Sequence, residues 1–121
     1  MNIIIESTSD KPIYQQLYEQ ISSQIIKGEL EGNFSLPPIR TAAKELRISI
    51  ITVKKAWEEL ERKGFIYTIA GKGCFVSDLS TTKVLDLRNE LTDKQMSKHI
   101  SYYKELGLSL DDIIALIKKH Y

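Results

Sequence analysis

The sequence predicts a mainly α-helical protein that carries one small β-hairpin. Apolar residues recur every three or four positions in several separate stretches, the spacing of an α-helix with one buried face. Residues 65–76 instead combine aromatic and β-branched residues with a glycine-rich turn, which is typical of two paired strands. After Ser80 the helical spacing returns. We therefore expect an N-terminal arm (1–10), a compact domain (11–79) and a helical tail (80–121).

The first helix is predicted to follow the arm directly. Its apolar residues recur every four positions, at Ile13, Leu17, Ile21 and Ile25. Asp10 can cap this helix, with Lys11 and Pro12 in the first turn, where the missing N–H of proline costs nothing. The helix should end near Gly28. The three isoleucines at positions 3–5 of the arm could add a strand or pack on the core.

Two further helices are predicted after a loop at residues 29–36. The first is short, opens at Pro37-Pro38 and has an apolar stripe formed by Ile39, Ala42, Ala43 and Leu46. Ser49 can cap the next helix, whose apolar face consists of Val53, Ala56, Trp57 and Leu60. Gly64 should end that helix, after two basic residues that suit the negative end of the helix dipole.

The hairpin is predicted to pair residues 65–69 with residues 74–76. The four residues 70–73 between them include two glycines and form the turn. Cys74 lies in the second strand. We expect it to be buried as a small apolar residue, because the chain has no second cysteine that could resolve an oxidised thiol.

The tail is predicted to contain a long amphipathic helix and a short one. The long helix runs to about Leu106, has a polar middle at residues 89–98 and ends at Gly107. Ser109 and Asp112 have the spacing of a capping box for the last helix. A monomer of this size buries such apolar faces poorly, so we expect a homodimer formed through Leu87, Leu91, Ile100, Tyr103, Ile113, Leu116 and Ile117.

Composition and charge narrow the class of protein. The chain is 42% hydrophobic and 27% charged, which suits a globular domain with a core, and no apolar run is long enough to span a bilayer. We see no secretion signal, and a single cysteine fits the reducing cytoplasm. The net charge is only +1, but residues 40–72 hold eight basic and four acidic side chains, a net +4. That local excess indicates either a surface that faces a polyanion or a solvated helix surface.

Three helices followed by a β-hairpin is the element order of a winged helix-turn-helix domain. In that fold the third helix enters the major groove of DNA. If its apolar face is buried, its opposite face presents Ile50, Ile51, Lys54, Lys55 and Glu58. Thr52 lies near the helix N-terminus, where free N–H groups favour a phosphate. The hairpin tip has one cation, Lys72, between two glycines, which suits a wing lying in a minor groove or along the backbone.

Residues 11–77 resemble the DNA-binding domain of the GntR family. The similarity rests on a leucine-proline start to the second helix with an arginine three residues after the first proline, and on a serine-x-x-threonine-valine start to the third helix. It also includes a leucine-glutamate-x-x-glycine-phenylalanine-isoleucine segment and a glycine-lysine-glycine wing. The opening PIYQQLYEQI and the short tail are similar to the YtrA-like subfamily, in which the tail is a dimerisation hairpin.

The resemblance implies a homodimeric repressor that binds double-stranded DNA at an inverted repeat, often beside genes for a membrane transporter. Carried over by position, the DNA-contacting residues are Arg40 in the second helix, Ser49, Thr52 and Lys54 in the third, and Gly71 and Lys72 in the wing; the exposed-face residues Ile50 and Lys55 join them. Position 50 commonly holds arginine in the family. Isoleucine cannot make a bidentate contact to guanine, although it can meet a thymine methyl group.

Other classes of function find less support. The sequence shows no catalytic triad, no P-loop, no paired carboxylates in a plausible pocket and no histidine or cysteine group at metal-ligand spacing, so we expect neither an enzyme, a cofactor nor a metal. About 40 residues follow the wing, too few to enclose a small-molecule effector in a separate domain, and no effector is identified. The alternative is a winged-helix module that binds another protein and has no specific DNA site.

Overall fold

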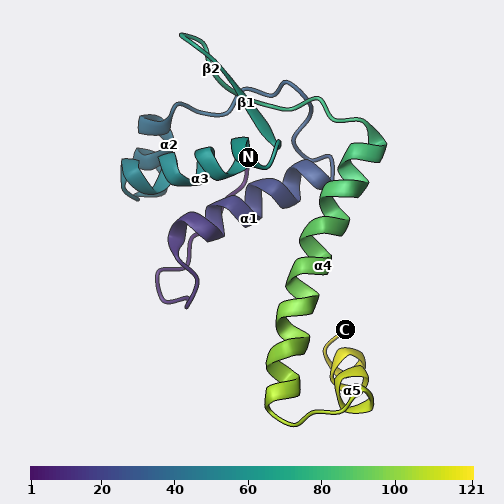
Figure 1. Cartoon of the computed structure of the whole chain (residues 1–121). Coiled ribbons are helices and arrows are strands. Elements are labelled where there is room, and N and C mark those ends of the chain that lie inside the picture. Colours follow the sequence, from purple (N-terminus) through teal and green to yellow (C-terminus); the bar gives the residue numbers. More distant parts are fainter. The chain divides into compact units, whose positions relative to one another are not determined.

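The computed structural model describes all 121 residues and contains five helices and one two-stranded antiparallel hairpin (Figure 1). The elements are α1 (Ile13–Ile26), α2 (Ile39–Leu46), α3 (Ile50–Arg62), β1 (Ile66–Ile69), β2 (Gly73–Val76), α4 (Thr81–Glu105) and α5 (Leu110–His120). They form two compact units, Met1–Ser80 and Thr81–Tyr121. The predicted fold class, mainly helical with a small hairpin, is confirmed.

The core of the first unit lies between α1 and α3, with α2 against α3. The predicted apolar face of α3 is buried as expected, since Val53, Ala56, Trp57 and Leu60 are all at most 3% exposed. Leu17 and Ile21 of α1 are fully buried in the same core. Phe65, also fully buried, meets the ring of Tyr18 edge-on, so the residue that leads into the hairpin is part of this core.

The predicted start of α1 is wrong by two residues. Pro12, in an extended conformation, is the N-cap residue, and no side chain caps the helix. Asp10 is exposed and too far upstream to reach the free N–H groups of the first turn. The end of α1 agrees with the prediction, because the helix stops at Ile26 and Gly28 adopts a positive φ of 78°.

The N-terminal arm forms no strand; its backbone is bound by glutamine side chains of α1. The Gln16 amide accepts from the Glu6 N–H and donates to the Glu6 carbonyl, each at 2.9 Å. Gln20 makes the same pair of bonds with Ile4, at 2.9 and 2.6 Å, and Gln24 donates to the Asn2 carbonyl at 2.6 Å. Four helical residues rise about 6 Å and two extended residues span about 6.6 Å, so successive glutamines meet alternate arm residues.

The second unit consists of α4 and α5 joined by a short turn. Gly107, with a φ of 87°, ends α4, as predicted. Ser109 and Asp112 form the predicted capping box: the Ser109 Oγ accepts from the Asp112 N–H, and the Asp112 carboxylate accepts from the Ser109 N–H at 2.9 Å. These bonds from Ser109 favour the charged carboxylate and hold the pKa of Asp112 below its ordinary value.

The hydrogen bonds from Gln16, Gln20 and Gln24 to the backbone of the arm, which we call the glutamine ladder, give a first testable prediction. Gln16 is 8% exposed and makes two bonds to the backbone of Glu6 in the arm and one to the Lys11 carbonyl, so Gln16→Ala leaves several part-buried groups without partners. We expect the free energy of unfolding in urea to fall by about 1–3 kcal/mol. Gln15→Ala is the matched control, because the Gln15 amide reaches only Glu19, at 3.4 Å. An equal loss in the two variants would show that the arm contributes nothing through this ladder.

Candidate nucleic-acid interface

The turn between α2 and α3 is short and tightly built. Arg47 ends α2 in the left-handed conformation (φ 56°, ψ 44°), and the Ile48 N–H donates to the Ala43 carbonyl at 3.0 Å. Ala42 and Ala43 are buried, and their small side chains let α2 approach α3 closely. Only residues 47–49 separate the two helices, so the start of α3 is held at a defined angle to α2.

The start of α3 is ordered by its own side chains. Ser49 is the N-cap, as predicted, and its Oγ accepts from the Thr52 N–H at 3.1 Å. The hydroxyls of Ser49 and Thr52 also lie 2.7 Å apart. The remaining N–H groups of a first helical turn have no partner within the helix and, with the positive end of its dipole, favour an anion such as a phosphate.

The outward face of α3 carries the residues predicted from its spacing. Ile50 and Ile51 are 41% and 78% exposed, and Lys54 and Lys55 are exposed as well. The two lysines differ in their surroundings. The Lys55 Nζ lies 3.8 Å from the centre of the Tyr14 ring on α1, whereas the Lys54 Nζ is 3.9 Å from a carboxylate oxygen of Glu58. Lys55 is thus drawn back over α1 by a cation–π contact that the sequence did not reveal.

The hairpin is the candidate wing, and its turn is shorter than predicted. Gly73 belongs to β2 and pairs with Ile69, so the turn has three residues rather than four. The Lys72 N–H closes it by donating to the Ile69 carbonyl at 2.9 Å, and Gly71 supplies a φ of 78°. Gly71 and Lys72 are both exposed at the tip. Cys74 is only half-buried, so the prediction that it is buried is wrong; its Sγ lies 3.3 Å from the Thr68 hydroxyl near the tip.

Residues 33–36, which lie in the predicted loop, anchor the base of the wing. Ser35 bridges to Phe75, and the Leu36 N–H donates to the Cys74 carbonyl at 2.9 Å. On the other side, the Tyr67 ring stacks on Phe75, and its hydroxyl donates to the Asn33 side chain at 2.8 Å. The bridging stretch is too short to show the alternating pattern of a strand, so it could not be predicted from sequence.

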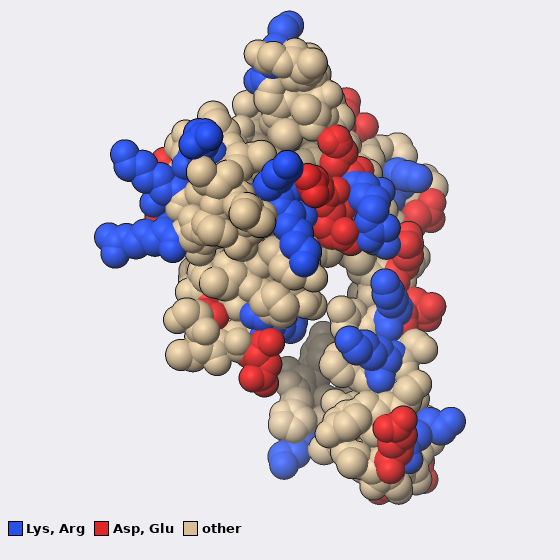
Figure 2. Space-filling model, turned by 60° about the vertical axis from the view of Figure 1, so that its left-hand side comes forward, with Lys and Arg blue, Asp and Glu red and all other residues tan.

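Basic side chains gather at the hairpin tip and around α2 and α3, with a group of acidic side chains beside them (Figure 2). Several of these cations are already engaged: Arg62 pairs with Glu59, which raises the pKa of the guanidinium, and Lys54 approaches Glu58. Four others are exposed and form no ion pair within the chain, on α2, on the α2–α3 turn and at the wing tip: Arg40, Lys44, Arg47 and Lys72. They leave a cationic surface open to a polyanion.

The residues predicted for dimerisation are placed differently in the second unit. Leu87 and Ile113 are buried, Leu91, Ile100, Tyr103 and Leu116 are half-buried, and Ile117 is 48% exposed. The exposed apolar stripe of α5 instead follows spacings of four, three and four residues and consists of Leu110, Ile114, Ile117 and Tyr121. We call this set the α5 stripe. Ile113 follows Leu110 by three residues and precedes Ile117 by four, so this buried residue borders the stripe and α5 is apolar over one broad face.

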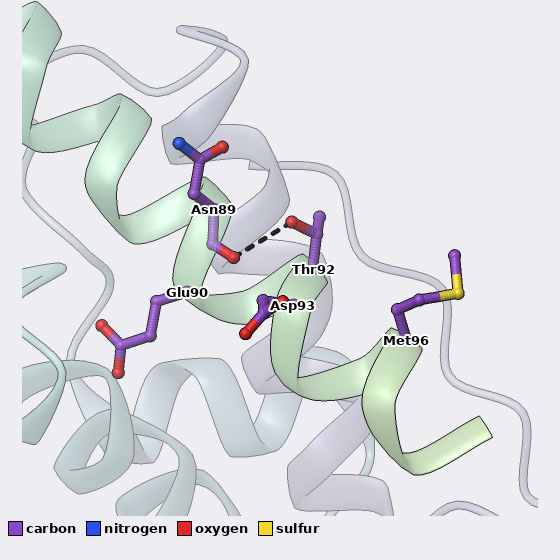
Figure 3. A pocket seen from close by; sticks show the side chains of 5 residues that line it. All are labelled: Asn89, Glu90, Thr92, Asp93 and Met96. Atoms are coloured by element: carbon purple, nitrogen blue, oxygen red, sulfur yellow. Dashed lines mark hydrogen bonds between the residues drawn. The ribbon is translucent and has the colours of Figure 1, made fainter. Parts of the chain in front are cut away.

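A hollow of about 640 Å³ beside α4 is lined by Asn89, Glu90, Thr92, Asp93 and Met96 (Figure 3). All five come from this one helix, and the Thr92 hydroxyl is turned back to the Asn89 carbonyl.

No three histidine, cysteine or acidic side chains come together as metal ligands. No helix is long and apolar enough to cross a membrane. The α2–α3 pair and the wing therefore remain the candidate site.

A three-helix core, a tight α2–α3 turn and an exposed hairpin define a winged helix-turn-helix protein. The family model described as "Bacterial regulatory proteins, gntR family" matches residues 13–76, which include α1 to α3 and the whole wing. The chain belongs to the GntR family, and the resemblance inferred from its motifs is confirmed. It is thus a DNA-binding transcription regulator.

Similar proteins extend this likeness over nearly the whole chain. The transcriptional repressor YtrA of Bacillus subtilis is 30% identical over 97% of this chain and 90% of its own length. A GntR-family regulator from Listeria monocytogenes is similar in structure, with a TM-score of 0.74 and 31% identity over 92% of this chain and 96% of that one. The AraR DNA-binding domain, solved in complex with its operator ORX1, has a TM-score of 0.55 and 26% identity, over 64% of this chain and 96% of that one.

Proposed function

We propose that this protein is a cytoplasmic transcriptional repressor that binds an inverted-repeat operator as a homodimer. The observation that carries the proposal is the set of unpaired cations on α2, its turn and the wing tip, beside the capped start of α3. The relative YtrA is named as a repressor, and AraR is solved on an operator. By analogy with YtrA-like regulators, we propose that the controlled genes lie next to its own and encode a transporter.

In this proposal α3 lies in the major groove and the wing follows the backbone. Arg40 stands in the first turn of α2, exposed and without an ion pair, which leaves its guanidinium free for a guanine edge or a phosphate. Ser49 and Thr52 present hydroxyls at the start of α3, where a phosphate is favoured. Lys72 and Gly71 would contact the backbone from the wing. Lys54 and Lys55 must release Glu58 and Tyr14 to reach DNA, at a modest cost because such surface contacts are weak.

The α5 stripe supports the homodimer. Leu110, Ile114, Ile117 and Tyr121 leave apolar surface in water along the whole of α5, although the helix already buries Ile113. A second copy of the same stripe is the simplest cover, because a two-fold interface pairs a surface with itself. Two-fold symmetry also accounts for an operator made of two inverted half-sites.

Binding to DNA upstream of its own gene tests the function. Fluorescence anisotropy with that duplex and a shuffled one, at two salt concentrations, should show saturable binding with a preference on the order of a thousandfold. Equally weak and steeply salt-dependent binding to both duplexes would contradict specific recognition at this site. Absence of binding to either at low salt would favour the protein-interaction alternative.

Arg40→Ala should weaken binding to the operator by about 1–3 kcal/mol and relax the preference at one base pair in each half-site. The reason is the loss of a free guanidinium at the start of α2. The measurement is anisotropy on a set of single-base operator variants. Arg62→Ala is the matched control, since the Arg62 side chain is occupied by Glu59 at the far end of α3. An equal loss on unrelated DNA would make Arg40 a phosphate contact instead.

Ile117→Glu should convert the dimer to a monomer, because it places a charge in the centre of the α5 stripe. Light scattering coupled to gel filtration should give twice the mass of one chain for the native protein and one chain mass for the variant. Lys118→Glu, a charge change at the next residue and outside the stripe, should leave the dimer intact. A dimeric Ile117→Glu protein would place the interface elsewhere.

A further inference from the structure

Two isoleucines at the start of α3 leave apolar surface in water. Ile50 is 41% exposed and Ile51 is 78% exposed, and both precede the first buried residue of the helix, Val53. The buried residues of α3 are Val53, Ala56, Trp57 and Leu60, and they include neither isoleucine. On the outer side of α3 Ile51 stands among the charged residues Lys54, Lys55 and Glu58, and a partner that covered its apolar side chain would gain free energy.

The surroundings of the pair identify the partner's chemistry. On a helix, residues three and four positions apart are neighbours, so Lys54 lies beside both Ile50 and Ile51, and Lys55 lies beside Ile51. The hydroxyls of Ser49 and Thr52 and the free N–H groups belong to the same first turn of α3 as the pair. The patch is thus a small apolar area framed by groups that bind anions, whereas a purely apolar protein surface would leave those groups without partners.

The major groove of DNA offers the matching pattern. Its edges carry phosphates, and the apolar group on its floor is the C5-methyl group of thymine. An isoleucine side chain neither donates nor accepts a hydrogen bond. Placed against a G·C pair, it would displace water from the polar base edges without replacing the lost hydrogen bonds. Against a thymine methyl group it makes a favourable apolar contact.

We infer that Ile50 and Ile51 select thymine through its C5-methyl group, at one or two adjacent positions of each half-site. This inference rests on the proposed function, in which α3 enters the major groove. The specificity at these positions would then come from burying the methyl group against the isoleucine side chains rather than from hydrogen bonding. Ile51, which is not among the DNA-contacting residues that the family resemblance implies, becomes a specificity-determining residue.

Replacing single thymines of the operator by deoxyuridine tests the inference, because this change removes only the methyl group and keeps every base-pairing and groove hydrogen-bonding group. We expect native protein to bind about four-fold more weakly for each methyl that it contacts, as for one buried methylene-sized group. Ile51→Ala or Ile50→Ala should bind the thymine operator more weakly and lose that sensitivity to deoxyuridine. Ile4→Ala, which shortens a 69% exposed isoleucine in the arm, should keep it.

The outcomes separate the inference from the function on which it rests. Normal operator binding with no sensitivity to deoxyuridine at any position would overturn the inference and leave the repressor proposal intact. Sensitivity that survives in both isoleucine variants would also overturn it, since another group would then read the methyl. If the native protein shows no preference for the operator over a shuffled duplex, the proposed function itself fails and the inference with it.

Discussion

The packing of α3 on α1 is the contact on which the rest of the first unit depends. Val53, Ala56, Trp57 and Leu60 are almost completely buried, so the rotation of α3 about its own axis is fixed. Since residues on a helix are set about 100° apart, fixing that face also fixes the opposite one. The burial of the core face therefore also determines that Ile51 and the two lysines, Lys54 and Lys55, are exposed. No other contact is needed to turn this face of α3 outward. Truncating Trp57 would disturb function through this alignment even though its indole is not exposed.

Hydrogen bonds to backbone groups help to hold both the wing and the arm in place. A two-stranded hairpin alone is marginally stable in water, and here residues 33–36 add bonds along β2 while Phe65 ties β1 to the core. The extended backbone of the arm also has N–H and carbonyl groups that need partners, but it has no partner strand. The Gln16 and Gln20 side-chain amides each bond one N–H and one carbonyl of the arm instead. In both cases an exposed extended segment is fixed in place, which leaves the wing tip with a defined base and an accessible lysine.

Much of this architecture could be predicted because it follows from periodic burial. The stripes of α1 and α3, the Ser49 and Ser109 caps and the end of α4 at Gly107 are all local patterns of three or four residues. What failed was decided by tertiary contact. Asp10 has good capping chemistry, but the extended Pro12 takes the N-cap position. The sequence predicts Gly73 in the turn, but in the hairpin it belongs to β2 and pairs with Ile69. The glutamine ladder joins residues 10 to 22 positions apart, and side-chain amides give no periodic signal. The burial of Ile113 rather than Ile114 depends on how α5 folds back after its turn.

The charge balance explains why recognition in this protein should depend on more than phosphate contacts. The chain has a net charge of only +1, and cations of α3 contact Glu58, Glu59 and Tyr14. One copy of the protein therefore has few positive charges available to neutralise phosphates. Sequence-independent affinity grows with the number of phosphates neutralised, so a single copy would bind any duplex weakly at physiological salt. A second copy doubles the contacts without raising the charge density of either domain, and it admits only sites with the right spacing. In the proposed function, weak cationic attraction, apolar contact with bases and pairing through a short tail would therefore act together: the first limits binding to unrelated DNA, and the other two favour a site of matching sequence and spacing.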